Sequence, residues 1–212
     1  MQDWQISVKP VGELLMNSVL ITANGPEGAE SLLVDPGAEP DKLRHMIEQA
    51  GAPLVALAAT HGHFDHVAAA ADLQDSWDLP LLIHPRDMPL IDSLPQVMAA
   101  YGFPPARVPQ CRPTLGDDSI ITLAGHDIRV RHVPGHSPGQ VMFLLRGHAV
   151  VGDCLFQGSI GRTDLPGGDQ AQLEKSIRER IYTLPDDTVV ICGHGPDTTV
   201  GIERTTNPFV RG

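Results

Sequence analysis

The sequence predicts an α/β protein, an αββα sandwich in which two mixed β-sheets are flanked by helices. Short β-rich runs fill the first third of the chain and return after residue 118. Each of these two regions then passes through a strand and a loop into a helical pattern, so the chain has two similar halves. We expect these halves to form two sheets stacked between helices, within a single domain spanning residues 1–212.

The first half opens with three predicted strands. They are the β-rich runs at 4–10, 16–23 and 30–37. The third run ends in Asp35-Pro36-Gly37, which is typical of a turn.

A helix, a strand and a second helix are predicted next. Residues 39–51 carry apolar side chains at helical spacing and end at Gly51. Residues 53–60 form a continuous apolar run, which is the pattern of a buried strand. Residues 67–77 are again helical in pattern.

The middle of the chain is less regular. Residues 80–85 favour another strand, and the proline-rich segment 85–115 contains one predicted helix near 95–101. Strands are then predicted at 119–125, 126–135, 140–147 and 148–156. A glycine-rich loop over 157–169 leads into a helix at 170–182, and a last strand at 187–195 ends in a histidine loop.

Charge and composition exclude several partners. The formal net charge of -11 argues against a nucleic-acid partner, which would favour a basic surface. No apolar run reaches membrane-spanning length, so no membrane partner is expected. The segment "MQDWQISVKPVGELL" lacks a basic start followed by an apolar stretch, and the three cysteines form no CxxC motif. We therefore expect a cytoplasmic protein that acts on a small molecule.

Four metal-ligand residue types crowd into six positions between a predicted strand and a predicted helix. His61, His63, Asp65 and His66 form the pattern H-x-H-x-D-H. His61 and His63 are two residues apart, so they project to the same side of an extended segment. Asp65 and His66 follow the turn and can face a neighbouring point. Two adjacent ligand groups of this kind suit two metal ions held a few ångströms apart.

Three further donors each follow an apolar β-like run. His136 follows "IRVRHVPG", Asp153 follows "HAVVG" and His194 follows "TVVICG". Neutral imidazole and carboxylate are ligands that zinc, iron and manganese accept. Four strand ends thus deliver metal-ligand residue types. The remaining histidines lack this context and are interpreted as surface or structural residues: His45, His84, His126, His132 and His148.

These motifs resemble a known family. "THGHFDH", "PGHSPGQ", "GDCLF" and "CGHG" are similar to the successive motifs of metallo-β-lactamase-fold hydrolases, in that family's order and along nearly the whole chain. Within the superfamily, "GDCLFQGSIGRTDLPGGD" and "GHGPDTTVGIERTTNPF" most resemble the short glyoxalase II-like enzymes, the hydroxyacylglutathione hydrolase group.

The resemblance implies a role for each donor. His61, His63 and His136 would bind one metal, and Asp65, His66 and His194 the second. Asp153 would bridge both metals, and Asp65 and Asp153 would be the catalytic residues. Asp35 would orient a ligand histidine from outside the metal site. The expected cofactors are two divalent metal ions, zinc in the first place, with iron or manganese as alternatives.

The implied reaction is hydrolysis of a thioester. A hydroxide that bridges the metals would attack S-D-lactoylglutathione and release D-lactate and glutathione, a step of methylglyoxal detoxification. The leaving thiolate needs little protonation, so no strong general acid is required.

The residues that bind substrate are less clearly indicated. Full-length glyoxalase II has a C-terminal helical extension that helps to hold glutathione, whereas this sequence ends at "NPFVRG". Glutathione contacts would then come from elsewhere, or the thiol is a different one. Arg162 can bind a substrate carboxylate through its guanidinium fork, and pairing with Asp164 or solvent is the alternative.

Other reactions remain open within the resemblance. A persulfide dioxygenase shares the fold and a "GRTD" loop, but uses one iron held by two histidines and one aspartate. Hydrolysis of a different thioester or ester is a second alternative, and a non-catalytic metal-binding module is a third. The absence of a recognisable leader disfavours an exported β-lactamase, and the acidic balance disfavours a nuclease.

Overall fold

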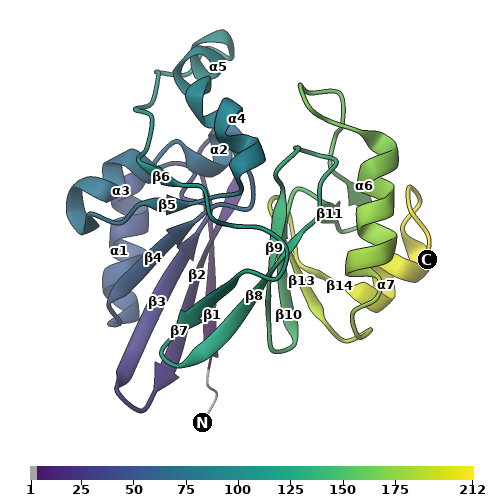
Figure 1. The fold of residues 1–212 in the computed structure, drawn as a ribbon, viewed down its shortest axis with the longest axis horizontal. Helices are drawn as coiled ribbons and strands as arrows, with labels where there is room; N and C mark the ends of the chain where they lie inside the picture. The colour runs from purple at the N-terminus through teal and green to yellow at the C-terminus, as the bar shows by residue number, and fades with distance from the viewer. Residues whose placement is uncertain (1–3) are drawn as a thin grey trace.

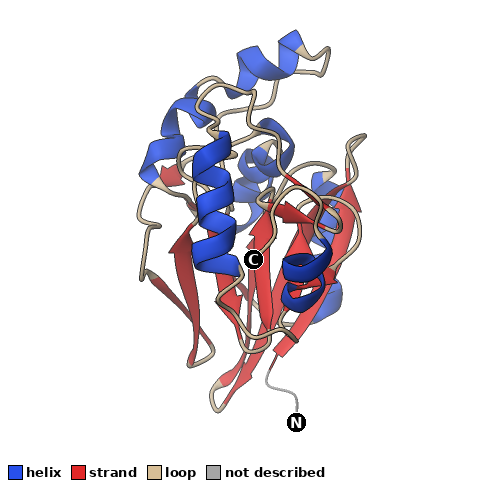
Figure 2. Ribbon diagram, turned by 90° about the vertical axis from the view of Figure 1, so that its right-hand side faces the viewer, coloured by secondary structure: helices blue, strands red, loops and turns tan. Residues whose placement is uncertain are grey.

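The computed structural model describes residues 4–212. It confirms the predicted αββα sandwich: two six-stranded mixed sheets stack face to face, and helices cover their outer faces (Figures 1 and 2). In the described part of the chain, no helix is long and apolar enough to cross a membrane.

The first sheet is built by the first half of the chain, in sequence order. Its strands are β1 (Trp4–Val11), β2 (Met16–Gly25), β3 (Gly28–Val34), β4 (Leu54–Ala58), β5 (Leu81–Leu82) and β6 (Cys111–Arg112). The first three strands pair antiparallel, and β3 to β6 pair parallel. Parallel pairing brings the carboxyl ends of β3, β4 and β5 to one edge of the sheet.

The second sheet is built by the second half and is reordered. Its strands are β7 (Ile120–Leu123), β8 (His126–His132), β9 (Val141–Leu145), β10 (His148–Gly152), β13 (Val189–Cys192) and β14 (Thr198–Thr199), in the order β14-β13-β10-β9-β8-β7. Only β10 and β13 pair parallel, so their carboxyl ends lie next to each other. A small hairpin of β11 (Leu155–Phe156) and β12 (Ser159–Ile160) follows β10.

Helices cover both outer faces of the sandwich. The first sheet carries α1 (Pro40–Ala50) and α3 (Ala70–Trp77), and the second carries α6 (Gln170–Ser176), the π-helical turn η2 (Ile177–Ile181) and α7 (Val200–Thr206) (Figure 1). Four short helices lie in the connections between β4 and β6: α2 (Phe64–Val67), η1 (Pro85–Asp87), α4 (Met88–Asp92) and α5 (Leu94–Ala100). Of these, α4 and α5 lie at the upper end of the molecule in Figure 1.

Strand alternation divides the interior into three apolar layers. In β3, Leu32 and Val34 face the layer between the sheets, while Leu33 faces the layer under α1 and α3. In β10, Val150 faces the layer between the sheets, and its neighbour Val151 faces α6. A strand with one apolar face toward each layer must be apolar throughout, which explains the continuous apolar runs in the sequence.

Several element boundaries differ from the predictions. The predicted strand at 148–156 is divided at Gly152, whose φ of 54° is left-handed. The helix predicted at 67–77 begins at Ala70, with the separate turn α2 before it, and the strand predicted at 80–85 is only β5. We did not predict α4, β6, β14 or α7. Polar and proline-rich sequences surround these short elements, and their conformations depend on contacts made by the complete fold.

Candidate metal centre

Loops after β4, β8, β10 and β13 bring the seven predicted donors to one place. His61 and His63 lie on the loop after β4, and Asp65 and His66 lie on α2, one turn further along. The other three donors come from the second half. His136 follows β8, Asp153 directly follows β10 and His194 lies two residues after β13. The local H-x-H-x-D-H motif of the first half and the three strand ends of the second half therefore place their donors at the same edge of the sandwich.

Three histidines form the first donor group. The ligand atoms of His61, His63 and His136 all lie within 4.8 Å of one another. The closest approach is 2.9 Å, between His63 Nδ1 and His136 Nε2. Three imidazole nitrogens at this spacing match the ligand set of one divalent cation.

Asp65, His66 and His194 form the second group. Their ligand atoms also lie within 4.8 Å of one another. Asp65 Oδ2 is 3.2 Å from His194 Nε2 and 3.9 Å from His66 Nε2. This mixed set of two imidazoles and one carboxylate suits zinc, iron or manganese.

Asp153 lies between the two groups. Its Oδ2 is 3.6 Å from His136 Nε2 in the first group and 3.6 Å from His194 Nε2 in the second. Its Oδ1 is 3.3 Å from His66 Nε2. A single carboxylate that faces both groups has the position that a bridging ligand requires.

Unpartnered polar atoms provide a test of whether metals fit here. Among the described residues, His61 Nε2, His66 Nε2 and Asp153 Oδ1 are buried and make no hydrogen bond. Leaving a buried polar atom without a partner costs about 1–3 kcal/mol. These atoms come from three different segments and point at the same volume. The donor set therefore fits two divalent cations.

One buried carboxylate supports the histidines of the first half. Asp35 Oδ2 accepts hydrogen bonds from His66 Nδ1 at 2.9 Å and from Thr60 Oγ1 at 2.8 Å, and Asp35 Oδ1 accepts from the Thr60 backbone N–H at 2.6 Å. The Thr60 hydroxyl in turn lies 3.0 Å from His61 Nδ1. Asp35 thus contacts one histidine directly and a second through Thr60, and its role in orienting these ligands stays a prediction.

Backbone carbonyls support the histidines of the second half. His136 Nδ1 lies 2.7 Å from the carbonyl oxygen of Arg162. His194 Nδ1 lies 3.0 Å from the carbonyl oxygen of Leu14. Each contact fixes the tautomer that leaves Nε2 free to face the site.

The charges of the site are strongly coupled. Burial and the surrounding imidazoles hold the pKa of His61 well below its ordinary value and lower the pKa of His63 to about 3. Burial also lowers the pKa of His66, but attraction to Asp153, Asp35 and Asp65 outweighs it and holds that pKa well above 6.5. Burial opposes ionisation of Asp153, but attraction to His66 and the other imidazoles lowers its pKa well below the usual range. Ligation requires neutral imidazoles and ionised carboxylates, so a cation bound here would release the proton that the carboxylates hold on His66.

A second buried carboxylate, Asp87, was missed by the sequence analysis. Its side chain accepts hydrogen bonds from the Gly62 N–H at 2.9 Å, the Ser137 hydroxyl at 2.7 Å and the Gly139 N–H at 2.6 Å. Gly62 lies between two ligands of the first half, and Ser137 follows a ligand of the second half. Asp87 therefore ties the two ligand loops together. Its neighbours "IHPRDMP" resemble an ordinary turn, so no sequence signal marked it.

Glycines leave room for the ligands at two close approaches. A Cβ on Gly193 would collide with the Asp153 carboxylate, and a Cβ on Gly152 would collide with the Thr60 side chain. Gly152 and Gly193 are therefore packing requirements of the metal site.

A cavity of about 560 Å³ opens above the metal donors. His63, Asp65, Asp153 and His194 line its floor, and apolar side chains of α4 and α5 line one wall. This volume lies within the range typical of small-molecule sites.

Arg162 lines the same cavity at its exposed rim. Its guanidinium forms a two-pronged pair with Asp164, with both N–O distances at 2.7 Å. The structure thus shows the pairing that was the alternative to substrate binding. A role in binding a substrate carboxylate stays a prediction, because the pair is exposed and free to rearrange.

Comparison with known proteins gives a consistent family. The model of the metallo-beta-lactamase superfamily matches residues 11–194. "Hydroxyacylglutathione hydrolase GloC" of Haemophilus influenzae is 38% identical over 210 residues, 97% of each chain. "Probable metallo-hydrolase YqgX" of Bacillus subtilis is 36% identical over 207 residues, 96% of each chain.

Solved structures extend this similarity. TTHA1623 in a di-iron-bound form is 40% identical with a TM-score of 0.84, over 96% of this chain and 100% of the other. BLEG-1, described as a B3 metallo-beta-lactamase, is 32% identical with a TM-score of 0.85, over 98% of this chain and 100% of the other.

Proposed function

The chain belongs to the metallo-beta-lactamase superfamily, and from that premise we propose that it is a two-metal hydrolase that cleaves a thioester, with S-D-lactoylglutathione as the first substrate to test. The superfamily identity supports metal-dependent hydrolysis as the general activity. The position of Asp153, which faces both donor groups at 3.6 Å, is the observation that carries the two-metal assignment.

Bound metal ions and the residues of the chain would have different roles in the reaction. Two divalent cations in such a site lower the pKa of water toward about 7 and polarise a carbonyl group. The chain places the carboxylates of Asp65 and Asp153 at the floor of the cavity, where they hold and orient an attacking water. Support from Asp35 and from the Arg162 and Leu14 carbonyls keeps the imidazoles in the orientation that faces the cavity.

The leaving group explains why no further acid is needed. A thiolate is stable at neutral pH, so its departure requires no strong general acid. The buried thiols Cys154 and Cys192 are not candidates for the nucleophile, because burial raises the pKa of both and raises that of Cys192 to about 12.

Glutathione as the thiol carrier rests on two observations. One relative that matches over 97% of each chain bears the name hydroxyacylglutathione hydrolase. Arg162 lies at the rim of the metal cavity, where its fork can exchange Asp164 for a substrate carboxylate.

Hydrolysis of S-D-lactoylglutathione by the zinc-, iron- or manganese-loaded chain tests this proposal. We expect metal-dependent turnover that is absent from the chelator-stripped protein and returns when metal is added back. Two parallel assays test the alternatives. Oxygen uptake with glutathione persulfide, measured with an oxygen electrode, would indicate a persulfide dioxygenase, and hydrolysis of a chromogenic cephalosporin would indicate a β-lactamase. Two bound metals with no thioester turnover, together with oxygen uptake or cephalosporin hydrolysis, would overturn it.

A further inference from the structure

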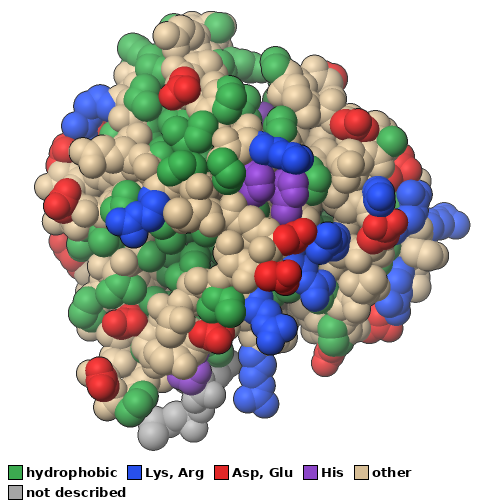
Figure 3. Space-filling model, viewed as in Figure 1, with side chains coloured by type: hydrophobic (Ala, Val, Ile, Leu, Met, Phe, Trp, Pro, Cys, Tyr) green, Lys and Arg blue, Asp and Glu red, His purple; other side chains and the backbone are tan. Residues whose placement is uncertain are grey.

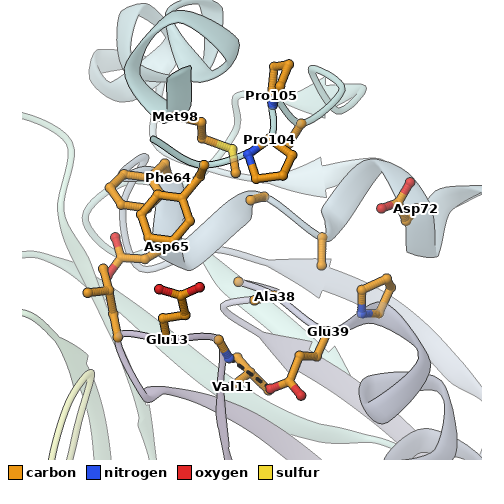
Figure 4. A pocket seen from close by; sticks show the side chains of 18 residues that line it. Val11, Glu13, Ala38, Glu39, Phe64, Asp65, Asp72, Met98, Pro104 and Pro105 are labelled. Atoms are coloured by element: carbon orange, nitrogen blue, oxygen red, sulfur yellow. Dashed lines mark hydrogen bonds between the residues drawn. The ribbon is translucent and has the colours of Figure 1, made fainter. Parts of the chain in front are cut away.

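A second cavity of about 430 Å³ lies beside the metal cavity (Figure 4). The turn between β1 and β2, residues 37–40, the first turn of α2, Met98 of α5 and residues 103–106 form its walls. Figure 3 shows apolar side chains gathered on the surface above this region, over α5 and the segment that leads to β6. Of these segments, α2 carries metal donors and the turn between β1 and β2 supports His194 through the Leu14 carbonyl.

The two cavities adjoin across a shared wall. Leu14, Phe64, Asp65 and Phe103 line both. Phe64 lies between two metal donors in the sequence, and its ring centroid is 5.5 Å from that of Phe103. A substrate whose reacting carbon lies at the metal donors can therefore extend past Phe64 into the second cavity.

The lining of the second cavity is apolar. Val11, Ala38, Phe64, Met98, Pro104 and Ala106 provide much of it, and no lysine, arginine or histidine is among the described lining residues. Figure 4 shows Phe64 and Met98 close together on one wall. Such a lining favours apolar groups. Each methylene that leaves water contributes about 0.8 kcal/mol to the free energy of binding, which corresponds to a roughly three- to fourfold change in affinity.

Carboxylates at the rim exclude anionic groups. Glu39 pairs with Lys42 at 3.0 Å, and Asp72 pairs with Arg107 at 2.6 Å. Glu13 makes no hydrogen bond or ion pair with any described residue, and Figure 4 shows its carboxylate directed into the cavity. An anionic tail placed here would meet that charge with no cation on the lining to balance it.

A lactoyl group is too small to use this space. It has three carbons, whereas a volume of about 430 Å³ is within the range of a complete small-molecule site. Arg162 lines only the metal cavity, so a carboxylate-bearing thiol belongs on that side. The acyl group then occupies the other side.

We propose that the second cavity is an acyl-binding subsite, and that the preferred thioester carries an uncharged, apolar acyl group longer than lactoyl. This proposal rests on the proposed thioester hydrolase activity and names its substrate class. Phe64, on the shared wall, separates the reacting carbonyl from the acyl tail.

A series of straight-chain acyl thioesters from acetyl to octanoyl tests the proposal on the metal-loaded enzyme. Each acyl group is presented on glutathione and on the uncharged thiol N-acetylcysteamine. We expect KM to fall roughly three- to fourfold per methylene until the cavity is filled, with the same trend on both thiols. Equal KM values across the series would overturn the proposal and leave thioester hydrolysis intact.

Cavity-filling variants locate the effect. Met98→Trp places bulk in the second cavity only, and Gln96→Trp places the same bulk on the exposed face of the same helix. We expect Met98→Trp to abolish the advantage of octanoyl over acetyl while acetyl turnover stays within about twofold, and Gln96→Trp to change neither. Ala106→Leu is the second cavity variant, in case Met98→Trp does not fold. A chain-length trend unchanged in a folded cavity variant would place the tail elsewhere and overturn the proposal.

A charge change tests the exclusion of anionic tails. Glu13→Lys should improve kcat/KM for a glutaryl thioester at least tenfold relative to the pentanoyl thioester. Glu27→Lys, the same charge change on the distant β2–β3 turn, is the control and should leave that ratio unchanged. No change of the ratio in Glu13→Lys would contradict the placement of the tail.

A binding measurement separates the two proposals. S-Methylglutathione and S-hexylglutathione are thioethers with no thioester bond to hydrolyse, so calorimetric titration with them is independent of turnover. Tighter binding of the hexyl compound that is lost in Met98→Trp would support the subsite even if no thioester is hydrolysed. Equal binding of both compounds, with thioesters hydrolysed normally, would mean that the subsite proposal alone has failed.

Discussion

The two halves of the metal centre obtain their donors and their support in different ways. The first half supplies four donors within six positions, and buried side chains orient its histidines. Asp35 contacts His66 directly and reaches His61 through Thr60. The second half supplies three donors from three separate loops. Main-chain carbonyls orient its histidines.

This difference predicts where the site is sensitive to substitution. A side-chain partner is removed by a single mutation, whereas a carbonyl remains whatever side chain the residue carries. We therefore expect substitutions of the residues that support the first half to weaken metal binding, and substitutions at Arg162 to leave it unchanged.

Asp35→Asn should have the largest effect. The Asp35 carboxylate accepts three hydrogen bonds, from Thr60 and His66. In asparagine an NH₂ group replaces one of the two oxygens, so at least one of these hydrogen bonds is lost. Loss of a carboxylate that orients a ligand typically costs 10–100-fold in metal affinity or activity. Titration with Co²⁺, followed by its absorption spectrum, measures the affinity directly.

Asp78→Asn is the matched control for this change. Both aspartates have left-handed backbone conformations, with φ of 56° for Asp35 and 48° for Asp78, and asparagine tolerates that region. Asp78 is exposed at the end of α3. Metal affinity that is equally reduced in both variants, or unchanged in Asp35→Asn, would contradict the assigned role.

Asp87→Asn should have the next largest effect, and on both halves together. The Asp87 carboxylate accepts hydrogen bonds from the N–H groups of Gly62 and Gly139. In asparagine an amide nitrogen would face one of these N–H groups, and that hydrogen bond would be lost. We expect a loss of about 1–3 kcal/mol in the free energy of unfolding and a weaker affinity for metal. Asp92→Asn, an exposed change on α4, should alter neither in urea unfolding and Co²⁺ titration.

Asn17→Ala should have a smaller effect on metal binding. The Asn17 side chain holds the main chain around His194, so this part of the second half does depend on one side chain. Asn17 Nδ2 donates to the carbonyls of Cys192 at 3.0 Å and Gly195 at 2.9 Å, on either side of His194. We expect Co²⁺ affinity to fall several-fold, less than for Asp35→Asn. Asn24→Ala, at the exposed end of β2, is the control. An effect as large as that of Asp35→Asn would erase the proposed difference between the halves.

Arg162→Ala should have the smallest effect on metal binding. Its carbonyl still accepts from His136, so we expect Co²⁺ affinity within about twofold of the wild type. If the guanidinium binds a substrate carboxylate, KM for S-D-lactoylglutathione should rise several-fold with kcat little changed. Asp164→Asn, which releases the guanidinium, should lower KM. An unchanged KM in both variants would remove Arg162 from the substrate site.

The same difference explains how much the sequence could predict. The pattern H-x-H-x-D-H is local, and two similar successions of strand-like runs, a loop and a helical pattern predicted the sandwich. His136, Asp153 and His194 were predicted because each follows an apolar run. Asp87 could not be predicted, because its partners lie 25 to 52 residues away and its own segment is an unremarkable turn. The contribution of Asn17 has the same cause, a partner 175 residues away.

The metal content of the chain tests the central claim most directly. Elemental analysis of the wild-type protein and of Asp153→Asn, each saturated with zinc and freed of excess, counts the ions per chain. We predict two ions in the wild type and at most one in the variant, because Asp153 faces both donor groups. One ion in the wild type, or two in the variant at unchanged affinity, would contradict a shared two-metal centre.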